Sequence, residues 1–208
     1  MNQNRGPLLI LASSSPRRRQ LISALNLPFA AVAADVDESC EAGAKPPEIV
    51  EELALRKAAA VYGKLPPELA GQAGVIIGAD TIVVCRGKVL GKPRDRAHAV
   101  EMLEMLQGKC HEVYSGLALI DAATGRTKTG HRRTVVRMKP MDRQRIERYA
   151  ASGEPDDKAG GYAIQGLGAM LVDSIDGCYF NVVGLPLSLL CDMLAEFGVD
   201  PFDSSFRE

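Results

Sequence analysis

The sequence predicts an α/β or α+β fold with a mixed β-sheet and flanking helices. Apolar runs typical of buried strands alternate along the chain with segments of helical periodicity, which favours strands connected through helices. Two further strand-like segments, 112–120 and 127–138, flank a turn around Thr124-Gly125 and predict a long hairpin. Because the arms of a hairpin are antiparallel, we do not expect a purely parallel sheet.

The first predicted strand and helix carry the most informative signal. Residues 8–12 form a buried strand, Ser15 is a suitable N-cap, and Pro16 suits the first turn of a helix over 16–26. Three arginines, residues 17–19, fill that turn, although the partial positive charge of a helix N-terminus disfavours cations there. Hydroxyls, free backbone N–H groups and guanidinium groups at one point indicate that a polyanion such as a phosphate chain docks there.

The remaining elements follow from apolar periodicity and from the positions of Gly, Pro and Asp. They are a strand at 29–34, a helix at 46–62, a loop at 64–74, a buried strand at 75–84 with a return at 89–90, a helix at 95–107, the hairpin, a helix capped by Asp142 that reaches Ser152, a loop at 154–168, strands near 168–175 and 178–183, and a helix at 186–197.

Lys57 lies on the apolar face of the helix at 46–62, seven residues after Val50 and four before Val61. A lysine on an inward face usually extends along it until the ammonium group reaches water. The alternative is a lysine that points into a cleft, where it would be available to a ligand.

Asp80 interrupts an otherwise apolar strand, between Ile77 and Val83. A buried carboxylate without a partner is costly, so Asp80 is expected to be hydrogen-bonded or to hold a metal, unless it lies at a turn or caps a structural network. Asp37 and Glu38 belong to the acidic segment 35–41, and such a segment by itself is typical of a solvated surface. Paired with Asp80 across a cleft, however, a carboxylate of this segment would complete an oxygen-ligand site for Mg²⁺ or Mn²⁺.

Lys92 lies in the rigid segment Gly91-Lys92-Pro93. Alone it is an ordinary surface lysine, but together with Arg17, Arg18 and Lys57 it would supply the charge to bind a triphosphate. The three histidines show no ligand spacing and are expected to be structural or exposed: His98, His111 and His131.

Composition and missing motifs exclude several classes of protein. The net charge of −1 gives no basic field for nucleic acid, and no apolar run is long enough to span a membrane or to form a signal peptide. The five scattered cysteines favour free thiols in a reducing cytoplasm. The chain has no Walker-type loop, no G-x-G-x-x-G after a strand and no G-x-S-x-G elbow, which argues against P-loop NTPases, Rossmann dehydrogenases and α/β-hydrolases.

Five segments in order along the chain resemble the Maf family of nucleoside triphosphate pyrophosphatases, a resemblance that covers about residues 8 to 198. They are Ser13-Ser14-Ser15-Pro16-Arg17-Arg18, Gly78-Ala79-Asp80-Thr81, Gly91-Lys92-Pro93, Asp157-Lys158-Ala159-Gly160-Gly161-Tyr162-Ala163-Ile164-Gln165-Gly166, and Asn181-Val182-Val183-Gly184-Leu185-Pro186-Leu187.

The resemblance implies a fold like that of inosine triphosphate pyrophosphatases, with an elongated mixed sheet and two lobes around a central cleft. It implies one domain over 1–208, with an N-terminal extension at 1–6 and a C-terminal tail at 199–208, and it is compatible with a homodimer. The implied activity is metal-assisted hydrolysis of a nucleoside triphosphate by water attack at the α-phosphorus, which releases pyrophosphate. Mg²⁺, Mn²⁺ or Co²⁺ would serve as the cofactor.

The resemblance also assigns roles to individual residues. Asp80 becomes the catalytic acid or base, and Asp80 with Glu38 would hold the metal. The residues around the substrate are Ser13, Arg17, Arg18, Lys57, Thr81, Lys92 and Gln165.

The family has two branches, which differ at a few positions. Ala79-Asp80-Thr81 and Tyr162-Ala163-Ile164-Gln165-Gly166 match the branch that acts on dTTP and UTP rather than on 7-methyl-GTP. By that analogy Arg17, Thr81 and Gln165 select the substrate, and a Gln amide can pair with both a donor and an acceptor on a pyrimidine edge. The alternatives are a non-catalytic nucleotide-binding regulator of cell division and a house-cleaning pyrophosphatase for modified purine nucleotides.

Overall fold

The computed structural model describes residues 7–41, 43–66, 69 and 74–203. The N-terminal extension expected at 1–6 and the last part of the expected C-terminal tail, 204–208, lie outside the described residues. The strands are β1 (Leu8–Ala12), β2 (Phe29–Val32), β3 (Gly74–Cys85), β4 (Lys88–Leu90), β5 (Cys110–Asp121), β6 (Thr127–Met138) and β7 (Val172–Asp176). The helices are α1 (Pro16–Ser23), α2 (Pro46–Tyr62), α3 (Arg96–Leu106), α4 (Arg143–Ala150), α5 (Tyr179–Val183) and α6 (Leu187–Glu196), with 3-10 helices η1 (Ala159–Gly161) and η2 (Gly166–Leu171).

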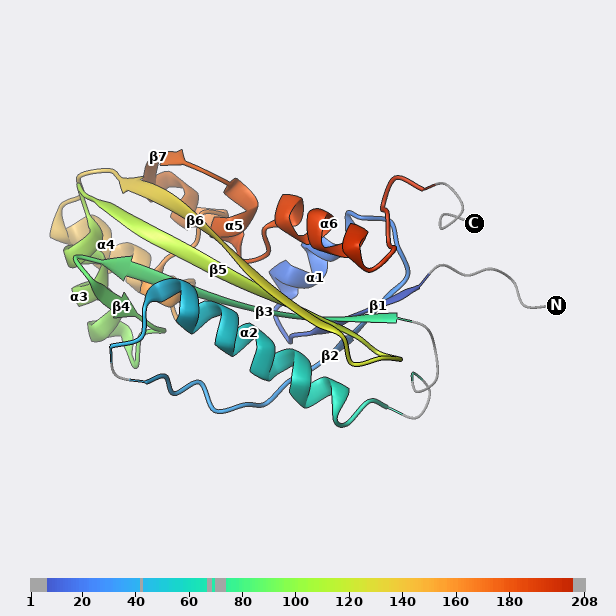
Figure 1. The fold of residues 1–208 in the computed structure, drawn as a ribbon. Helices are drawn as coiled ribbons and strands as arrows, with labels where there is room; N and C mark the ends of the chain where they lie inside the picture. The colour runs from blue at the N-terminus through green and yellow to red at the C-terminus, as the bar shows by residue number, and fades with distance from the viewer. Residues whose placement is uncertain (1–6, 42, 67–68, 70–73, 204–208) are drawn as a thin grey trace. The chain divides into compact units, whose positions relative to one another are not determined.

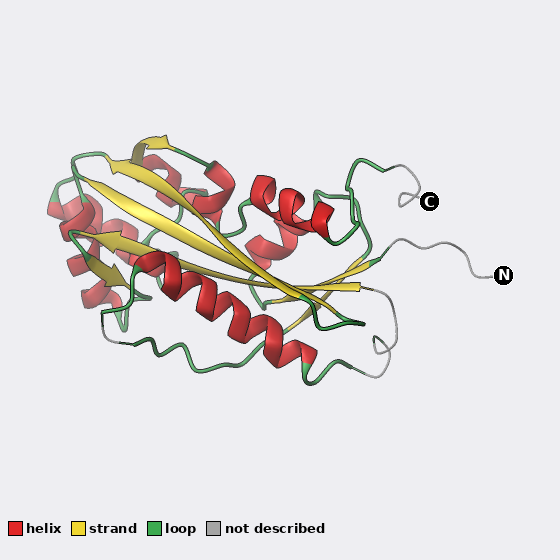
Figure 2. Ribbon diagram, in the orientation of Figure 1, coloured by secondary structure: helices red, strands yellow, loops and turns green. Residues whose placement is uncertain are grey.

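The strands form one mixed sheet in the order β2-β1-β3-β5-β6-β7, and β4 pairs with β3 outside this path (Figures 1 and 2). Strand β1 pairs in parallel with both β2 and β3, whereas the pairs β3–β4 and β6–β7 are antiparallel. The predicted fold class, a mixed sheet with flanking helices, is therefore confirmed.

The chain divides into two compact units. The first unit comprises 1–80, 116–131 and 184–208, and the second comprises 81–115 and 132–183. The long strands β3, β5 and β6 each begin in one unit and end in the other. The predicted site residues Asp80 and Thr81 are neighbours in β3 but belong to different units.

In the first unit, α2 packs against β1 (Figure 2). Four successive residues of β1, Leu9 to Ala12, are buried, as expected for a strand that has a parallel neighbour on each side. Ala54, Ala58 and Val61 of α2 complete this core on the helix side. The small side chains of Ala54 and Ala58 allow the backbone of α2 to lie close to the sheet.

In the second unit, the core lies between its part of the sheet and the helices α3 and α4, which contact each other. Val83 and Leu90 come from the sheet, Leu103 and Leu106 from α3, and Ile146 from α4. The spacing of Leu103 and Leu106 is that of an amphipathic helix, which is why this helix could be predicted within one residue of its ends.

The prediction of a strand at 178–183 is wrong, because Tyr179–Val183 forms the short helix α5. Its aromatic and β-branched residues have strand propensity, but that propensity is weak beside tertiary contacts. Asn181, at its centre, is fully buried and hydrogen-bonded within the second unit, which fixes the helical turn.

Other predicted boundaries also shift, most clearly at three elements. The helix expected at 16–26 ends at Ser23, and the strand expected at 29–34 ends at Val32. The strand expected near 168–175 begins only at Val172, because Gly166–Leu171 forms a 3-10 helix.

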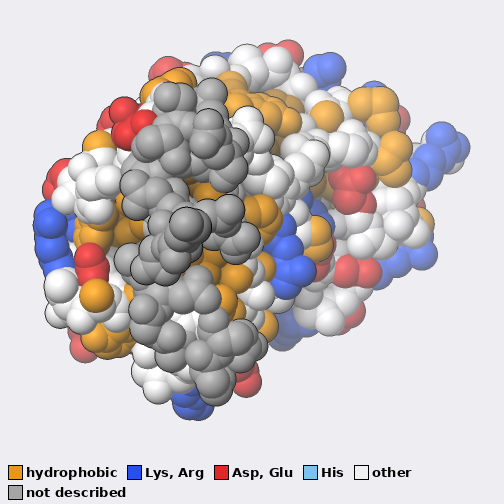
Figure 3. Space-filling model, turned by 90° about the vertical axis from the view of Figure 1, so that its right-hand side faces the viewer, with side chains coloured by type: hydrophobic (Ala, Val, Ile, Leu, Met, Phe, Trp, Pro, Cys, Tyr) orange, Lys and Arg blue, Asp and Glu red, His pale blue; other side chains and the backbone are white. Residues whose placement is uncertain are grey.

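Charged side chains of both signs are interspersed on the face drawn in Figure 3, in keeping with the net charge of −1. Among the described residues, none of the helices combines the length and the apolar character needed to cross a bilayer.

Candidate active site

The junction of β1 and α1 has the local structure that the sequence predicts. Ser15 is the N-cap of α1, its side chain accepts a hydrogen bond from the backbone N–H of Arg18 at 3.5 Å, and Pro16 is the first helical residue. Ser13 is buried, and its Oγ accepts a hydrogen bond from the backbone N–H of Ser15 at 3.2 Å. The first turn of α1 holds no acidic residue. The helix start is therefore a positively charged end that its own side chains do not neutralise.

Arg18 is anchored to a distant part of the first unit. Its Nε donates a 2.8 Å hydrogen bond to the backbone carbonyl of Gly184. Burial lowers the pKa of Arg18, while the negative charge of Asp80 opposes this, with smaller effects from Arg17 and Glu38. Arg18 is thus held within electrostatic reach of both predicted metal ligands, Asp80 and Glu38.

Lys57 joins the two predicted metal-binding carboxylates. Its Nζ lies 2.5 Å from Asp80 Oδ1 and 2.8 Å from Glu38 Oε1. The side chains of Lys57 and Asp80 are 11% and 10% exposed, whereas that of Glu38 is 55% exposed. The sequence analysis allows the Lys57 ammonium group either to reach water or to point inward, and in the structure it points inward, toward Asp80. Asp80 is hydrogen-bonded within a strand, so it does not lie at a turn.

Gly78 explains how α2 approaches β3 closely enough for this ion pair. A Cβ atom at Gly78 would lie 2.0 Å from the carbonyl oxygen of Ala54 and 2.9 Å from the backbone nitrogen of Ala58. Only glycine allows the helix backbone to pass over the strand at this distance. Lys57, one residue before Ala58, is therefore carried to Asp80, two residues after Gly78.

In the second unit, Thr81 belongs to a chain of hydroxyl groups. Thr81 Oγ1 lies 2.8 Å from Ser115 Oγ, and Ser115 Oγ donates to the backbone carbonyl of Asn181 at 2.8 Å. Ser115 and Asn181 are fully buried, while Thr81 is partly exposed. The predicted specificity residue therefore rests on two buried polar residues that the sequence analysis did not identify as part of the site.

Lys92 and Gln165, also in the second unit, lie in loops. Lys92 is exposed, and the preceding Gly91 accepts a hydrogen bond from the backbone N–H of Gly160 at 3.0 Å. Gln165 is partly exposed and immediately precedes η2. The structure thus connects the Gly91-Lys92-Pro93 segment to the glycine-rich segment that leads to Gln165.

Glu154 holds the segment that follows Gln165. Its carboxylate accepts hydrogen bonds from the backbone N–H groups of Leu167 at 2.9 Å and Gly168 at 2.8 Å. It also accepts one from the hydroxyl of Tyr149 at 2.9 Å, and that hydroxyl in turn accepts from the N–H of Ala163 at 3.3 Å. Sequence reasoning missed Glu154 because an acidic residue in a loop carries no local signal of these long-range bonds.

A buried pair supports the same segment from within. His111 Nε2 lies 2.7 Å from the hydroxyl of Tyr162, and the two rings meet edge to face. Burial lowers the pKa of His111 to about 4 and raises that of Tyr162, so both are neutral at physiological pH. His111 is therefore structural, as predicted, but it contacts the Tyr162 motif directly.

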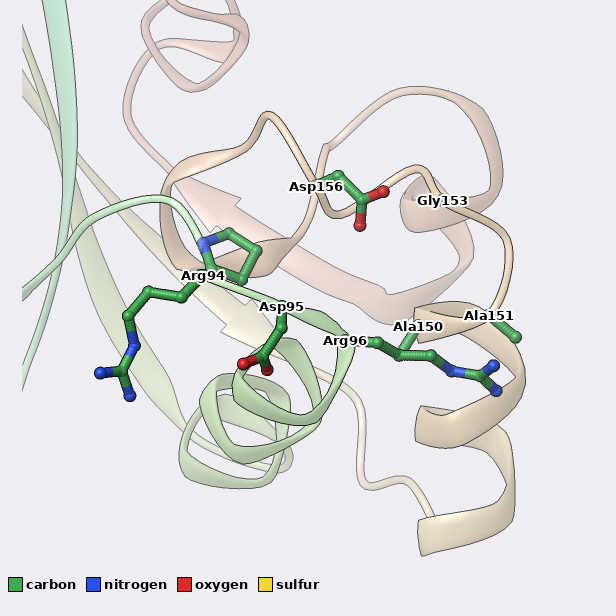
Figure 4. Close-up of a pocket in the computed structure, with 8 residues that line it drawn as sticks. Arg94, Asp95, Arg96, Ala150, Ala151, Gly153 and Asp156 are labelled. Atoms are coloured by element: carbon green, nitrogen blue, oxygen red, sulfur yellow. The ribbon is translucent and has the colours of Figure 1, made fainter.

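A hollow of about 390 Å³ in the second unit is large enough for a small ligand. Two basic and two acidic residues line it: Arg94, Arg96, Asp95 and Asp156. Figure 4 shows that the two guanidinium groups extend in opposite directions. Asp95 is already the N-cap of α3, where it accepts from the N–H of His98. The hollow therefore does not gather positive charge, and it contains none of the predicted site residues.

Comparison with known proteins gives one family and close relatives. The family model described as Maf-like protein matches residues 8–197. A protein of Desulforamulus reducens named dTTP/UTP pyrophosphatase is 53% identical over 192 residues, which is 92% of this chain and 97% of that protein. A protein of the same name from Pelotomaculum thermopropionicum is 52% identical over 91% of this chain and 96% of its own length.

Among solved structures, the Ham1 protein of Staphylococcus aureus is similar with a TM-score of 0.45 and 14% identity, over 79% of each chain.

Proposed function

The chain belongs to the Maf-like protein family, and on that premise we propose that it hydrolyses dTTP and UTP to the nucleoside monophosphate and pyrophosphate. Relatives that match over nine-tenths of the chain carry the name dTTP/UTP pyrophosphatase. The observation that supports the proposal most directly is the buried Lys57–Asp80 pair beside Glu38 and Arg18, because it places carboxylates and cations together, as a phosphate chain with a divalent cation requires. The protein would accordingly be a hydrolase acting on acid anhydrides.

The two carboxylates fit a divalent cation that is shared with substrate. In the described part of the chain, no three Asp, Glu, His or Cys side chains cluster so as to hold a metal by themselves. Asp80 and Glu38, however, both contact Lys57 Nζ and so lie near one another, and one or two carboxylates plus phosphate oxygens are the usual ligands of Mg²⁺ at phosphate sites. Mg²⁺, Mn²⁺ or Co²⁺ bound there would lower the pKa of a water molecule and offset phosphate charge.

The cations of the chain would bind the phosphates. Arg17 and Arg18 stand at the N-terminus of α1, where backbone N–H groups add to their charge. Lys57 has three N–H donors, so its contacts with Asp80 and Glu38 do not exhaust it. Ser13 and Lys92 are proposed to complete the phosphate contacts, from the β1–α1 junction and from the loop after β4. These groups would stabilise the charge that develops as pyrophosphate leaves.

Asp80 is proposed as the general base. It would orient or deprotonate the water that attacks the α-phosphorus, while Lys57 compensates its charge in a nearly dry environment. We propose that the nucleobase of the substrate is selected by Thr81, Gln165 and Arg17.

The five cysteines are all free, which supports a reducing compartment and hence the cytoplasm.

A substrate panel tests the proposal. The purified protein is incubated with dTTP, UTP, CTP, 7-methyl-GTP or ITP in the presence of Mg²⁺, Mn²⁺ or Co²⁺, and the products are separated. We expect monophosphate and pyrophosphate from dTTP and UTP, and loss of turnover with a chelator. Diphosphate and phosphate as products would contradict the proposal. Binding without turnover would favour a regulator, and a preference for ITP would favour a house-cleaning enzyme.

A further inference from the structure

The side chain of Tyr162 anchors the segment that leads to Gln165. Gly160 and Gly161, which precede it, have positive φ angles of 71° and 70° and carry no side chain that could hold the segment. Tyr162 and Gln165 both have extended backbone, and the three-residue step between them spans at most about 11 Å. The position of Gln165 therefore depends closely on how Tyr162 is held.

His111, near the start of β5, holds the Tyr162 hydroxyl. Its Nε2 lies 2.7 Å from that hydroxyl, and the two rings meet edge to face with their centroids 5.3 Å apart. The two residues are only 3% and 5% exposed, so bulk water cannot take the place of either partner. A lost contact would therefore leave a buried polar group unpaired rather than solvated.

The buried surroundings assign the direction of this hydrogen bond. A neutral imidazole has one N–H donor and one acceptor nitrogen, and Nδ1 of His111 has no hydrogen-bond partner among the described residues. A proton on Nε2 would leave both the Nδ1 lone pair and the Tyr162 proton unpaired. A proton on Nδ1 leaves only that N–H unpaired, because Tyr162 then donates to Nε2. The second arrangement costs less, so Nε2 is the acceptor.

We propose that His111 is a positioning residue for substrate binding: its Nε2 accepts the Tyr162 proton and so holds Gln165 where it contacts the nucleobase. The proposal rests on the proposed function, in which Gln165 contacts the base. It adds a residue of β5 that acts through Tyr162 rather than by touching the substrate.

The far end of the same segment is fixed independently. Glu154 accepts hydrogen bonds from the backbone N–H groups of Leu167 and Gly168, just after Gln165. Gln165 thus lies between two fixed points, Tyr162 on one side and Leu167 on the other. Loss of the His111 contact frees one of them, which should weaken the hold on the base and leave the reacting phosphates unaffected.

The test measures kcat and KM for UTP and CTP by pyrophosphate release. His111→Phe keeps an aromatic ring but has no acceptor nitrogen. We expect KM for UTP to rise about tenfold, in line with one hydrogen bond, while kcat stays near that of the wild type. The UTP/CTP ratio of kcat/KM should fall with it. His111→Gln, whose amide oxygen can accept from Tyr162, should restore most of the wild-type KM.

The hydroxyl itself is removed in Tyr162→Phe, which should raise KM for UTP as His111→Phe does. The double variant should be no worse than either single one, because both buried polar groups are then gone. Tyr114→Phe is the matched control: it removes the hydroxyl of another tyrosine of the second unit, which donates to Glu112 at 3.4 Å, and should keep the wild-type KM and ratio.

A second background separates positioning of Gln165 from a general effect on structure. Gln165→Ala should itself lower the UTP/CTP ratio. Adding His111→Phe to Gln165→Ala should then leave the ratio unchanged, because His111 acts through Gln165. If thermal melting shows that His111→Phe is unfolded, Tyr162→Phe, alone and with Gln165→Ala, decides the question by the same comparisons.

A readout independent of turnover is the tautomer of His111. Long-range ¹⁵N–¹H NMR of the imidazole in the wild-type protein, assigned by comparison with His111→Gln, should show the proton on Nδ1. A proton on Nε2 would contradict the inference whether or not the protein is active.

The outcomes that overturn the inference are distinct from failure of the proposed function. An active wild-type enzyme whose KM and UTP/CTP ratio are unchanged in folded His111→Phe contradicts the inference alone. So does a change of ratio that His111→Phe still causes in the Gln165→Ala background. A wild-type protein that releases no pyrophosphate from either nucleotide overturns the proposed function, and the inference with it.

Discussion

The ammonium nitrogen of Lys57 lies 2.5 Å from a carboxylate oxygen of Asp80, and both side chains are about nine-tenths buried. Removal of one partner from such a pair leaves the other charge uncompensated in a low-dielectric environment. The pair therefore links the stability of the first unit to the chemistry proposed for Asp80.

Lys57→Met should lower the free energy of unfolding by about 3 kcal/mol or more, the usual cost of breaking a buried ion pair. Denaturant titration measures the change. Arg143→Met is the matched control, because Arg143 pairs with Glu147 and Glu104 but its side chain is 72% exposed. That variant should lose no more than about 1 kcal/mol. Equal losses in the two variants would contradict a special role for the buried pair.

Asp80→Asn should reduce kcat for UTP by at least about 100-fold, because the amide cannot act as a general base. An amide oxygen can still accept a hydrogen bond from Lys57, and Glu38 still pairs with its charge, so the protein should fold with reduced stability, which circular dichroism and melting would check. Asp156→Asn, an exposed carboxylate elsewhere in the chain, should retain wild-type turnover. Near-normal turnover by a folded Asp80→Asn protein would remove Asp80 from the catalytic role.

Gly78→Ala should be strongly destabilising, because its methyl group would lie 2.0 Å from the carbonyl oxygen of Ala54. Overpacking of a well-packed site commonly costs about 1–3 kcal/mol, and here the obstacle is backbone rather than a flexible side chain. The displaced α2 should also carry Lys57 away from Asp80, so activity should fall with stability. Gly63→Ala at the end of the same helix has its nearest contact at 3.5 Å and should melt like the wild type.

Glu154→Gln should loosen the segment around Gln165, because the carboxylate that accepts from Leu167, Gly168 and Tyr149 is lost. Bonds to a charged acceptor are worth about 1.5–3 kcal/mol, so hydrogen exchange at Leu167 and Gly168 should accelerate on the order of tenfold or more. We expect KM for UTP to rise more than kcat falls. Glu147→Gln, which alters a carboxylate that pairs with exposed Arg143, is the control, and unchanged exchange in Glu154→Gln would contradict the positioning role.

His111 should make stability depend on pH between about 6.5 and 4. Burial lowers the pKa of His111 from 6.5 to about 4, so above pH 6.5 the ring is neutral in both the folded and the unfolded state. Between these values only the unfolded chain binds the proton, and stability falls as the pH falls, by about 3 kcal/mol in total. The His111→Phe variant should lack this part of the slope. Carboxylates titrate in both proteins, so the difference between the two curves isolates His111.

The predicted elements were reliable where local chemistry is strong. Pro46 and Gly63 delimit α2, Ser15 and Asp142 cap their helices, and the glycine of the Thr124-Gly125 turn adopts the positive φ that ends the hairpin arm. Helix α5 could not be predicted in the same way, because the burial of Asn181 depends on partners more than forty residues away in the chain.

Part of the candidate site was also accessible to sequence reasoning. Asp80 stood out as an acid in an apolar strand, and its partner Lys57 as a lysine on an apolar helix face. Ser115 and Glu154 gave no such signal, since a serine in a strand and a glutamate in a loop are ordinary. Their roles arise only from the hydrogen bonds that the fold creates.

The anchoring of Arg18 has a consequence for biosynthesis. Arg18 and the Gly184 carbonyl that binds it are 166 residues apart in the sequence. At the usual rate of translation, roughly 10 to 30 seconds separate their synthesis. The nascent chain therefore presents Arg18 long before Gly184 leaves the ribosome, and a truncated product that ends before residue 184 would carry Arg18 without this hydrogen bond.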